Sequence, residues 1–242
     1  CSSGDSYGFG ASTTAFEDIS GVGTQLTLTD DSNANAPIGF DFSFFGSGFA
    51  DCYIGSNGYI TFGAGSNVYV NTAIPAAALP NNAIYAMWDD LNPAAGGAVY
   101  YATLGTAGVD QRFIAQWTGV PQFAQTDSNT FQIVLFPNGE FDLRYGQVSP
   151  FDDVDMTVGA ENADGTQAGS IPASSVLSDS ALHGVFRAGS PACGGSSCVW
   201  QTDGCFADYD NSGGIDSDDV IAFFGAWDGG DSCADVDGSG GT

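Results

Sequence analysis

The sequence predicts an all-β protein with a small calcium-binding appendage. Short runs of β-branched and aromatic residues alternate with Gly, Asn, Asp and Pro through residues 16–189, as in strands joined by turns. Within a run, apolar residues recur at every second position, as Phe40, Phe42 and Phe44 do, so one strand face is apolar. Near the C-terminus, Asp, Gly and Ser adopt calcium-loop spacing. We expect an antiparallel, jelly-roll-like β-sandwich followed by a calcium loop and a helix.

The expected strands are the apolar runs bounded by turn residues. No run in this region has convincing helical periodicity, which favours a sandwich. The runs are residues 25–29, 38–45, 52–54, 59–62, 84–88, 99–103, 112–117, 130–136, 140–145, 157–161 and 183–187. Pro137-Asn138-Gly139 predicts a hairpin between two of them, because Asn-Gly readily adopts the positive φ angles of a tight turn.

Several phrases resemble a β-sandwich domain of secreted and cell-surface bacterial proteins, over about residues 14–170. These phrases are FEDIS (16–20), SNGYITF (56–62), MWDDLNP (87–93), RFIAQW (112–117) and GAENADGT (159–166). The resemblance implies an extracellular, non-catalytic module and brings no catalytic residues with it.

The charge balance narrows the possible partners. The chain carries 29 acidic residues against three arginines and no lysine, giving a formal net charge of −26. Nucleic acid is excluded as a partner, because phosphate binding relies on lysine and arginine. The excess charge favours either a salty medium or several bound divalent cations. No apolar run approaches the roughly 20 residues that span a bilayer.

Six cysteines indicate disulfides, hence an oxidising compartment and secretion. Sequence alone leaves their pairing open. We expect Cys193–Cys198 across a short loop, Cys205–Cys233 closing the appendage, and Cys1–Cys52 as the remaining pair. Cys1 could instead carry a lipid. No basic or apolar export segment precedes it, so we expect that any such signal is removed or not included.

The predicted calcium loop covers residues 208–219. Its oxygen-bearing side chains stand at the ligand positions of a twelve-residue loop, with Gly213 at the sharp turn. An apolar helical pattern follows over residues 218–227. The expected ligands are Asp208, Asp210, Ser212, the carbonyl of Gly214, Asp216 and Asp219.

A truncated repeat follows and offers Asp235, Asp237, Ser239 and Gly241. Its missing ligands would come from water, another segment or a neighbouring molecule. The tandem over residues 203–242 resembles dockerin-like calcium modules of secreted bacterial proteins, although Ser212 replaces the usual acid and the second helix is missing. We therefore expect four segments: an arm (1–15), the sandwich (16–189), a Gly/Ser/Cys linker (190–202) and the calcium module (203–242).

A second calcium candidate is Asp89, Asp90 and Asn92, whose oxygens could cage a hard cation if the chain turns there. The alternative is a solvated turn. Two similar but weaker candidates are Asp30-Asp31-Ser32-Asn33 and Asp152-Asp153-Val154-Asp155.

We expect no enzymatic activity. The one histidine, His183, stands in a predicted strand, and no Gly-x-Ser-x-Gly elbow occurs in the chain. The aromatic residues Tyr100, Tyr101, Trp117 and Phe123 are either a sugar-stacking platform or core residues.

The function expected from these features is that of a calcium-stabilised structural protein of the cell surface or extracellular matrix. It would assemble into a filament or layer, with residues 2–15 adding a strand to a neighbour's sheet and the C-terminal module docking onto a partner. That partner is another copy or another extracellular protein. The alternative is a polysaccharide-binding accessory module, attached to an extracellular enzyme complex by its dockerin-like tail.

Overall fold

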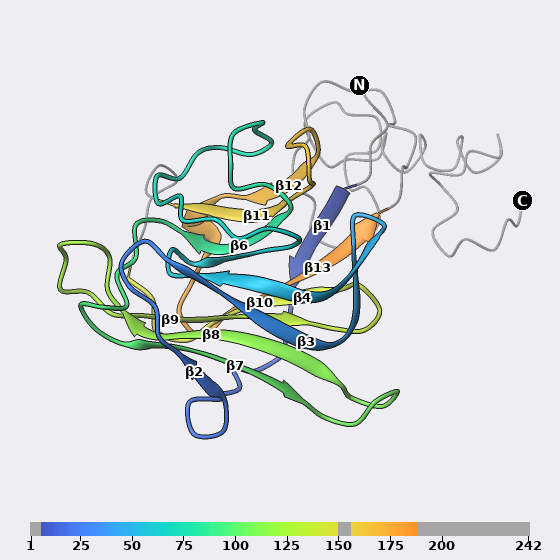
Figure 1. Ribbon diagram of the computed structural model, residues 1–242, viewed down its shortest axis with the longest axis horizontal. Coiled ribbons are helices and arrows are strands. Elements are labelled where there is room, and N and C mark those ends of the chain that lie inside the picture. Colours follow the sequence, from blue (N-terminus) through green and yellow to red (C-terminus); the bar gives the residue numbers. More distant parts are fainter. Residues whose placement is uncertain (1–5, 150–155, 188–242) are drawn as a thin grey trace, which may run out of the picture. The chain divides into compact units, whose positions relative to one another are not determined.

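The computed structural model describes residues 6–149 and 156–187, and these residues form β-strands and one 3₁₀ turn, η1 (Ala173–Ser175) (Figure 1). The strands are β1 (Ser6–Ala11), β2 (Thr24–Leu26), β3 (Asn33–Phe44), β4 (Ser47–Gly55), β5 (Tyr59–Thr61), β6 (Ala83–Trp88), β7 (Ala98–Leu104), β8 (Arg112–Val120), β9 (Asn129–Leu135), β10 (Phe141–Tyr145), β11 (Thr157–Glu161), β12 (Ala168–Ile171) and β13 (Ala181–Arg187). The all-β prediction is confirmed.

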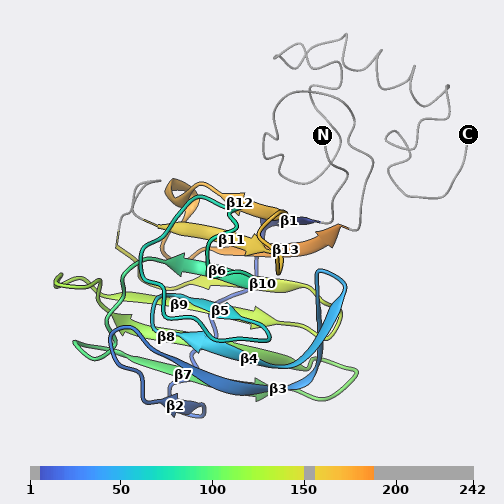
Figure 2. The ribbon, with the colours of Figure 1, turned by 45° about the horizontal axis from the view of Figure 1, so that its top comes forward.

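Two antiparallel sheets lie face to face (Figure 2). The seven-stranded sheet has the order β1-β13-β10-β9-β8-β7-β2, and the six-stranded sheet has the order β12-β11-β6-β5-β4-β3. Two runs of consecutive strands each stay within one sheet: β3 to β6 and β7 to β10 each form a meander. The jelly-roll expectation is therefore wrong, because each of these strands pairs with its neighbour in sequence within the same sheet.

The core lies between the sheets and is rich in aromatic residues. Phe42 and Phe44 of β3 are fully buried, as the alternation predicted. From the opposite sheet, Trp117 stacks on Phe131 with ring centroids 4.9 Å apart. The Trp117 indole N–H donates a hydrogen bond across the core to the Gly55 carbonyl, at 3.1 Å. This bond satisfies the one polar group that the indole brings into the core.

The predicted hairpin at Pro137-Asn138-Gly139 is confirmed. It joins β9 to β10, and the Phe136 amide donates to the Glu140 carbonyl at 3.0 Å. Gly139 has a φ of 87°, in the region that favours glycine.

The N-terminal residues differ from the expected arm. Residues 6–11 form β1, which pairs antiparallel with β13 at one edge of the seven-stranded sheet. Tyr7 and Phe9 are buried in the core, and the Tyr7 hydroxyl donates to the Gly139 carbonyl at 3.0 Å. The sequence did not predict this strand, because the alternation of Tyr7 and Phe9 is short and its neighbours are Gly, Ser and Ala. The short strand β12 was likewise not predicted.

A separate segment covers part of each sheet's outer face. Ile19 packs on Ile114 and Val134 of the seven-stranded sheet. On the six-stranded sheet, Ile74 packs against Tyr59, Tyr85 and Trp88. Both outer faces are therefore partly buried.

Cys52 is the one cysteine among the described residues, and it is a free thiol with no exposed surface. Burial raises the pKa of this thiol. Its expected partner, Cys1, lies outside the described residues, as do the other cysteines, so the disulfide pairings stay predictions. No helix in the described part of the chain is long and apolar enough to cross a membrane.

Candidate metal centre

Three carboxylates from two separate parts of the sequence meet at one edge of the domain. Asp30 and Asp31 lie in the turn between β2 and β3, and Asp90 follows the end of β6. One oxygen of each lies within 4.8 Å of the others. The weaker candidate at Asp30-Asp31 and half of the stronger candidate at Asp89-Asp90 thus form a single cluster, which we call the acidic cluster (Asp30, Asp31 and Asp90).

A buried polar turn between β4 and β5 holds these loops together. The Asn57 side-chain amide donates to Asp31 Oδ1 at 3.0 Å, and Asn57 Oδ1 accepts from the Leu91 amide at 3.0 Å. Beside it, Ser56 Oγ accepts from the Ser32 amide at 3.0 Å. Ser56 and Asn57 are almost completely buried. Their side chains therefore fix the spacing between Asp31 and Asp90.

Gly58 completes this turn and admits no side chain. Its φ is 78°, and a Cβ atom there would lie 1.8 Å from the Met87 carbonyl oxygen. The Gly58 carbonyl accepts from the amides of Ala86 and Met87 at 3.2 and 3.1 Å. This close approach ties the turn to the end of β6, next to Asp90.

The electrostatics of the cluster are those of uncompensated negative charge. Burial, followed by repulsion from Asp31, Asp30 and Asp89, raises the pKa of Asp90 to about 6. Burial and Asp31 also raise the pKa of Asp30. Within the described residues, no ion pair involves a member of the cluster.

One oxygen of the cluster has no hydrogen-bond partner. Asp30 Oδ1 is shielded from solvent and unbonded, which is costly for a carboxylate. A hard cation would satisfy this oxygen and remove the repulsion. Ca²⁺ fits the donor set, because it takes six to eight oxygen ligands and water molecules can supply those that the three carboxylates do not.

The other residues of the expected Asp89-Asp90-Asn92 site have different partners. The Gln122 side-chain amide donates to Asp89 Oδ2. Asn92 Oδ1 accepts from the amides of Ala94 and Ala95 at 2.9 and 3.0 Å, so it caps the following turn. The structure therefore joins Asp90 to Asp30 and Asp31 instead of Asn92.

The remaining metal predictions lie outside the described residues. They are the loop ligands Asp208, Asp210, Ser212, Gly214, Asp216 and Asp219, the partial repeat Asp235, Asp237, Ser239 and Gly241, and the candidates Asp152, Asp153 and Asp155.

The aromatic residues do not form one platform. Trp117 is fully buried between the sheets. Tyr101 packs toward the main core against Phe113, whereas Tyr100 packs with the cluster around Ile19 on the opposite face of its sheet. Phe123 is 51% exposed, and its amide donates to the Asp90 carbonyl at 2.7 Å. Of the four, Trp117 is thus a core residue.

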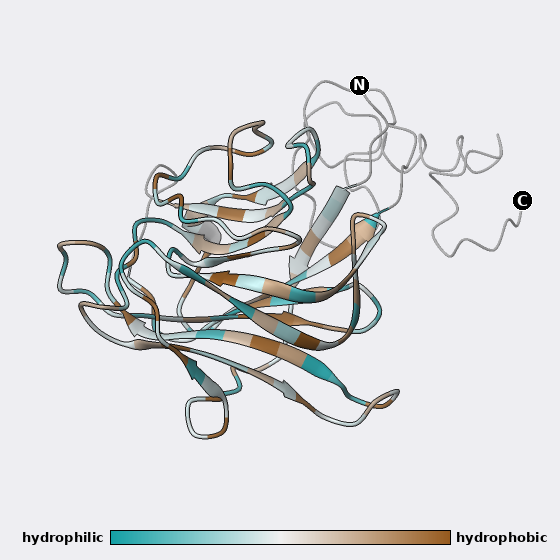
Figure 3. Ribbon diagram, viewed as in Figure 1, coloured by the Kyte–Doolittle hydropathy of each residue, from teal (hydrophilic) through white to brown (hydrophobic). Residues whose placement is uncertain are grey.

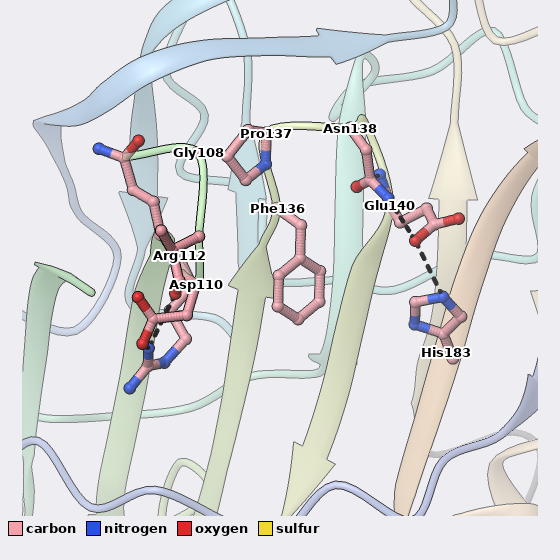
Figure 4. A pocket seen from close by; sticks show the side chains of 10 residues that line it. Gly108, Asp110, Arg112, Phe136, Pro137, Asn138, Glu140 and His183 are labelled. Atoms are coloured by element: carbon pink, nitrogen blue, oxygen red, sulfur yellow. Dashed lines mark hydrogen bonds and ion pairs between the residues drawn. The ribbon is translucent and has the colours of Figure 1, made fainter. Parts of the chain in front are cut away.

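The one histidine lines a pocket of about 570 Å³ on the seven-stranded sheet (Figure 4). His183 Nδ1 lies 2.7 Å from Asp142 Oδ1, and its Nε2 lies 3.4 Å from Glu140 Oε2. Across the Phe136 ring, Arg112 pairs with Asp110 at 3.8 Å. Arg112 also pairs with Glu17 at 2.5 Å, outside the pocket lining. These contacts leave both basic side chains engaged by carboxylates.

Sequence reasoning missed Ser56 and Asn57 as parts of the site. The phrase SNGYITF reads as a turn between strands, and nothing local shows that its polar side chains are buried. The one sequence feature that could have indicated Ser56 and Asn57 is their position in a phrase that resembles a known domain.

The fold and site define a two-sheet β-domain with an acidic cluster at one edge. A family model described as NIDO related matches residues 6–190, and the chain belongs to this family. NIDO-related domains are typically extracellular. No curated protein and no solved structure matches the chain.

Proposed function

We propose that this chain is a non-catalytic structural protein of the extracellular space that binds Ca²⁺ at Asp30, Asp31 and Asp90 and assembles with copies of itself. The acidic cluster carries the calcium proposal, since three carboxylates converge and one of their oxygens is buried without a partner. In this role calcium is structural. It holds the turn before β3 against the end of β6.

The extracellular setting supports this assignment. Extracellular calcium modules bind with dissociation constants of about 0.1 to 1 mM, so a partly exposed site with few ligands suffices there. A chain with a net charge of −26 also gains from each divalent ion that it binds.

The environment of His183 supports a structural role. A histidine acting as a general base needs a proton donor within reach, whereas both ring nitrogens of His183 face carboxylates. Assembly would use the C-terminal calcium module, whose first loop is predicted to bind a further ion. The incomplete repeat at Asp235 and Asp237 would take its missing ligands from a neighbouring copy.

Calorimetric titration of the full chain with CaCl₂ tests the calcium sites. Asp30→Asn with Asp90→Asn removes two charged ligands of the acidic cluster while keeping side-chain shape. Asp208→Ala with Asp219→Ala removes two ligands of the predicted C-terminal calcium loop. Each pair should remove the calcium bound at its own site, and only the cluster pair should abolish the calcium-dependent rise in melting temperature of the β-domain.

Asp41→Asn is the matched control, because Asp41 is an exposed carboxylate on β3 outside the cluster. It should leave binding unchanged. Full calcium stoichiometry in the Asp30→Asn, Asp90→Asn protein would overturn the assignment of this site. A protein that stays monomeric in millimolar calcium would overturn the assembly role.

A further inference from the structure

Charge is unevenly distributed along this chain. Between Asp51 and Asp89 there is no Asp, Glu, Lys, Arg or His, although the chain as a whole carries 29 acidic residues. Much of this segment is buried in β4, β5 and β6. The rest, residues 63–82 between β5 and β6, forms a loop that we call the neutral loop.

The neutral loop is firmly attached to the six-stranded sheet. Ile74 is buried against the aromatic cluster on the outer face. The Val68 carbonyl accepts hydrogen bonds from the Tyr59 hydroxyl at 3.0 Å and the Trp88 indole at 3.3 Å. At the other end of the loop, buried Glu161 accepts from the Ala76 amide at 2.5 Å. These anchors leave the opposite side of the loop facing solvent.

Apolar residues make up most of the exposed side chains of the loop, beside the polar Asn67 and Thr72. Tyr69, Val70 and Leu79 are 45%, 59% and 67% exposed. Several smaller apolar residues are exposed with them: Ala64, Ala73, Pro75, Ala77 and Ala78. Figure 3 colours parts of this loop, which precedes β6, as hydrophobic. Apolar side chains concentrated on one anchored loop indicate a contact surface, because burying apolar surface lowers the free energy by about 25 cal/mol per Å².

Charge favours a second copy of this chain as the occupant. Two molecules that each carry −26 repel wherever their acidic surfaces meet. A basic partner would be drawn to those acidic surfaces, whereas a loop without charge offers it no electrostatic attraction. Two neutral loops can touch while the acids stay apart, and salt screens the remaining repulsion over about 8 Å.

Building on the self-association proposed above, we propose that the neutral loop is the surface through which two copies of the β-domain contact each other. The contact would be isologous, with the same loop presented by both copies. Any calcium-dependent contact of the C-terminal module would then be a second, independent interface, as a filament requires.

Sedimentation velocity of the full chain in millimolar calcium, at about 50 and 500 mM NaCl, tests this surface. Wild-type protein should associate more strongly at high salt. Val70→Asp places one charge in each copy's loop and should raise the dimer dissociation constant at least tenfold. The matched control is Val22→Asp, because Val22 is exposed, at 73%, on a different turn. The Val70→Asp and Val22→Asp variants are measured again in a background that carries Asp208→Ala and Asp219→Ala. These two substitutions remove any calcium-dependent association through the C-terminal module.

Unchanged association of Val70→Asp, in a wild-type background that associates, would overturn the assignment of the loop and leave the assembly role standing. Equal weakening by Val22→Asp would also overturn it, because charge at any site would then suffice. A wild-type monomer under all conditions would overturn both proposals.

Discussion

The acidic cluster and the neutral loop are joined to the same strand but have opposite character. The neutral loop leads into β6, and Asp90 follows the end of β6. The acidic cluster lies at the C-terminal end of β6, and among the described residues none of its three carboxylates forms an ion pair. The N-terminal end of β6 is preceded by the 20 residues of the neutral loop, which carry no charge. In the two proposals, acidic residues meet where a cation would bind, and charge is absent where two copies would touch.

The two regions are also held by different means. Short polar side chains, Ser56 and Asn57, hold the loops of the acidic cluster. The neutral loop relies on an aromatic cluster and on one buried carboxyl, Glu161. Substitutions at each set of anchors therefore separate the two regions experimentally.

The largest effect is expected at the anchor of the neutral loop. Glu161 accepts from the Ala76 amide and from the Tyr85 hydroxyl at 2.9 Å, and it is fully buried. Glu161→Ala leaves these donors unsatisfied and should lower the free energy of unfolding by about 3 kcal/mol in urea titrations.

Glu161→Gln is the matched control for this anchor. The carboxamide oxygen can accept from the Ala76 amide. The Tyr85 hydroxyl, which also contacts the Pro80 carbonyl, can donate to that carbonyl and accept from the new N–H₂ group. This variant should cost less than about 1 kcal/mol. Equal losses for both variants would mean that Glu161 does not act through these bonds.

A smaller effect is expected from the pH dependence of the calcium-free protein. The folded pKa of Asp90, about 6, lies above its ordinary value near 4. The stability that this group contributes is therefore fully present below about pH 4 and is lost as pH rises through 6. Relative to Asp90→Asn, the wild-type protein should lose about 1 kcal/mol between those limits, since partial exposure screens the repulsion.

Urea unfolding of both proteins in calcium-free buffers across this pH range measures that difference. Saturating calcium should abolish it, because the cation offsets the repulsion that disfavours the charged carboxylate. Parallel pH profiles of the two proteins without calcium would contradict the placement of Asp90 beside Asp30 and Asp31.

The smallest effect is expected on the exposed side of the neutral loop. Val70→Asn removes apolar surface from a side chain that is already 59% exposed. The free energy of unfolding at a concentration that favours the monomer should change by no more than about 0.5 kcal/mol, while association weakens. A large loss of monomer stability would show that Val70 serves folding instead of contact.

The strands and the hairpin could be predicted because their signals are local. Alternation along Phe131, Ile133 and Leu135 marks a strand face whatever that strand later contacts, and Asn138-Gly139 encodes its own turn. β1 was not predicted, because its alternation of apolar residues consists only of Tyr7 and Phe9 among small residues. Its burial depends on the partner strand β13, from the far end of the domain.

By itself, the sequence determined the fold class, the acidic excess and each short acidic motif, because composition and neighbouring residues set these properties. Only the tertiary structure decided that Asp30 and Asp31 meet Asp90, that Trp117 faces inward, and that the neutral loop presents Val70 to solvent. The physical reason is distance along the chain. Which loops meet depends on how two sheets pair and pack, and here buried Asn57 between β4 and β5 brings the acidic motifs together.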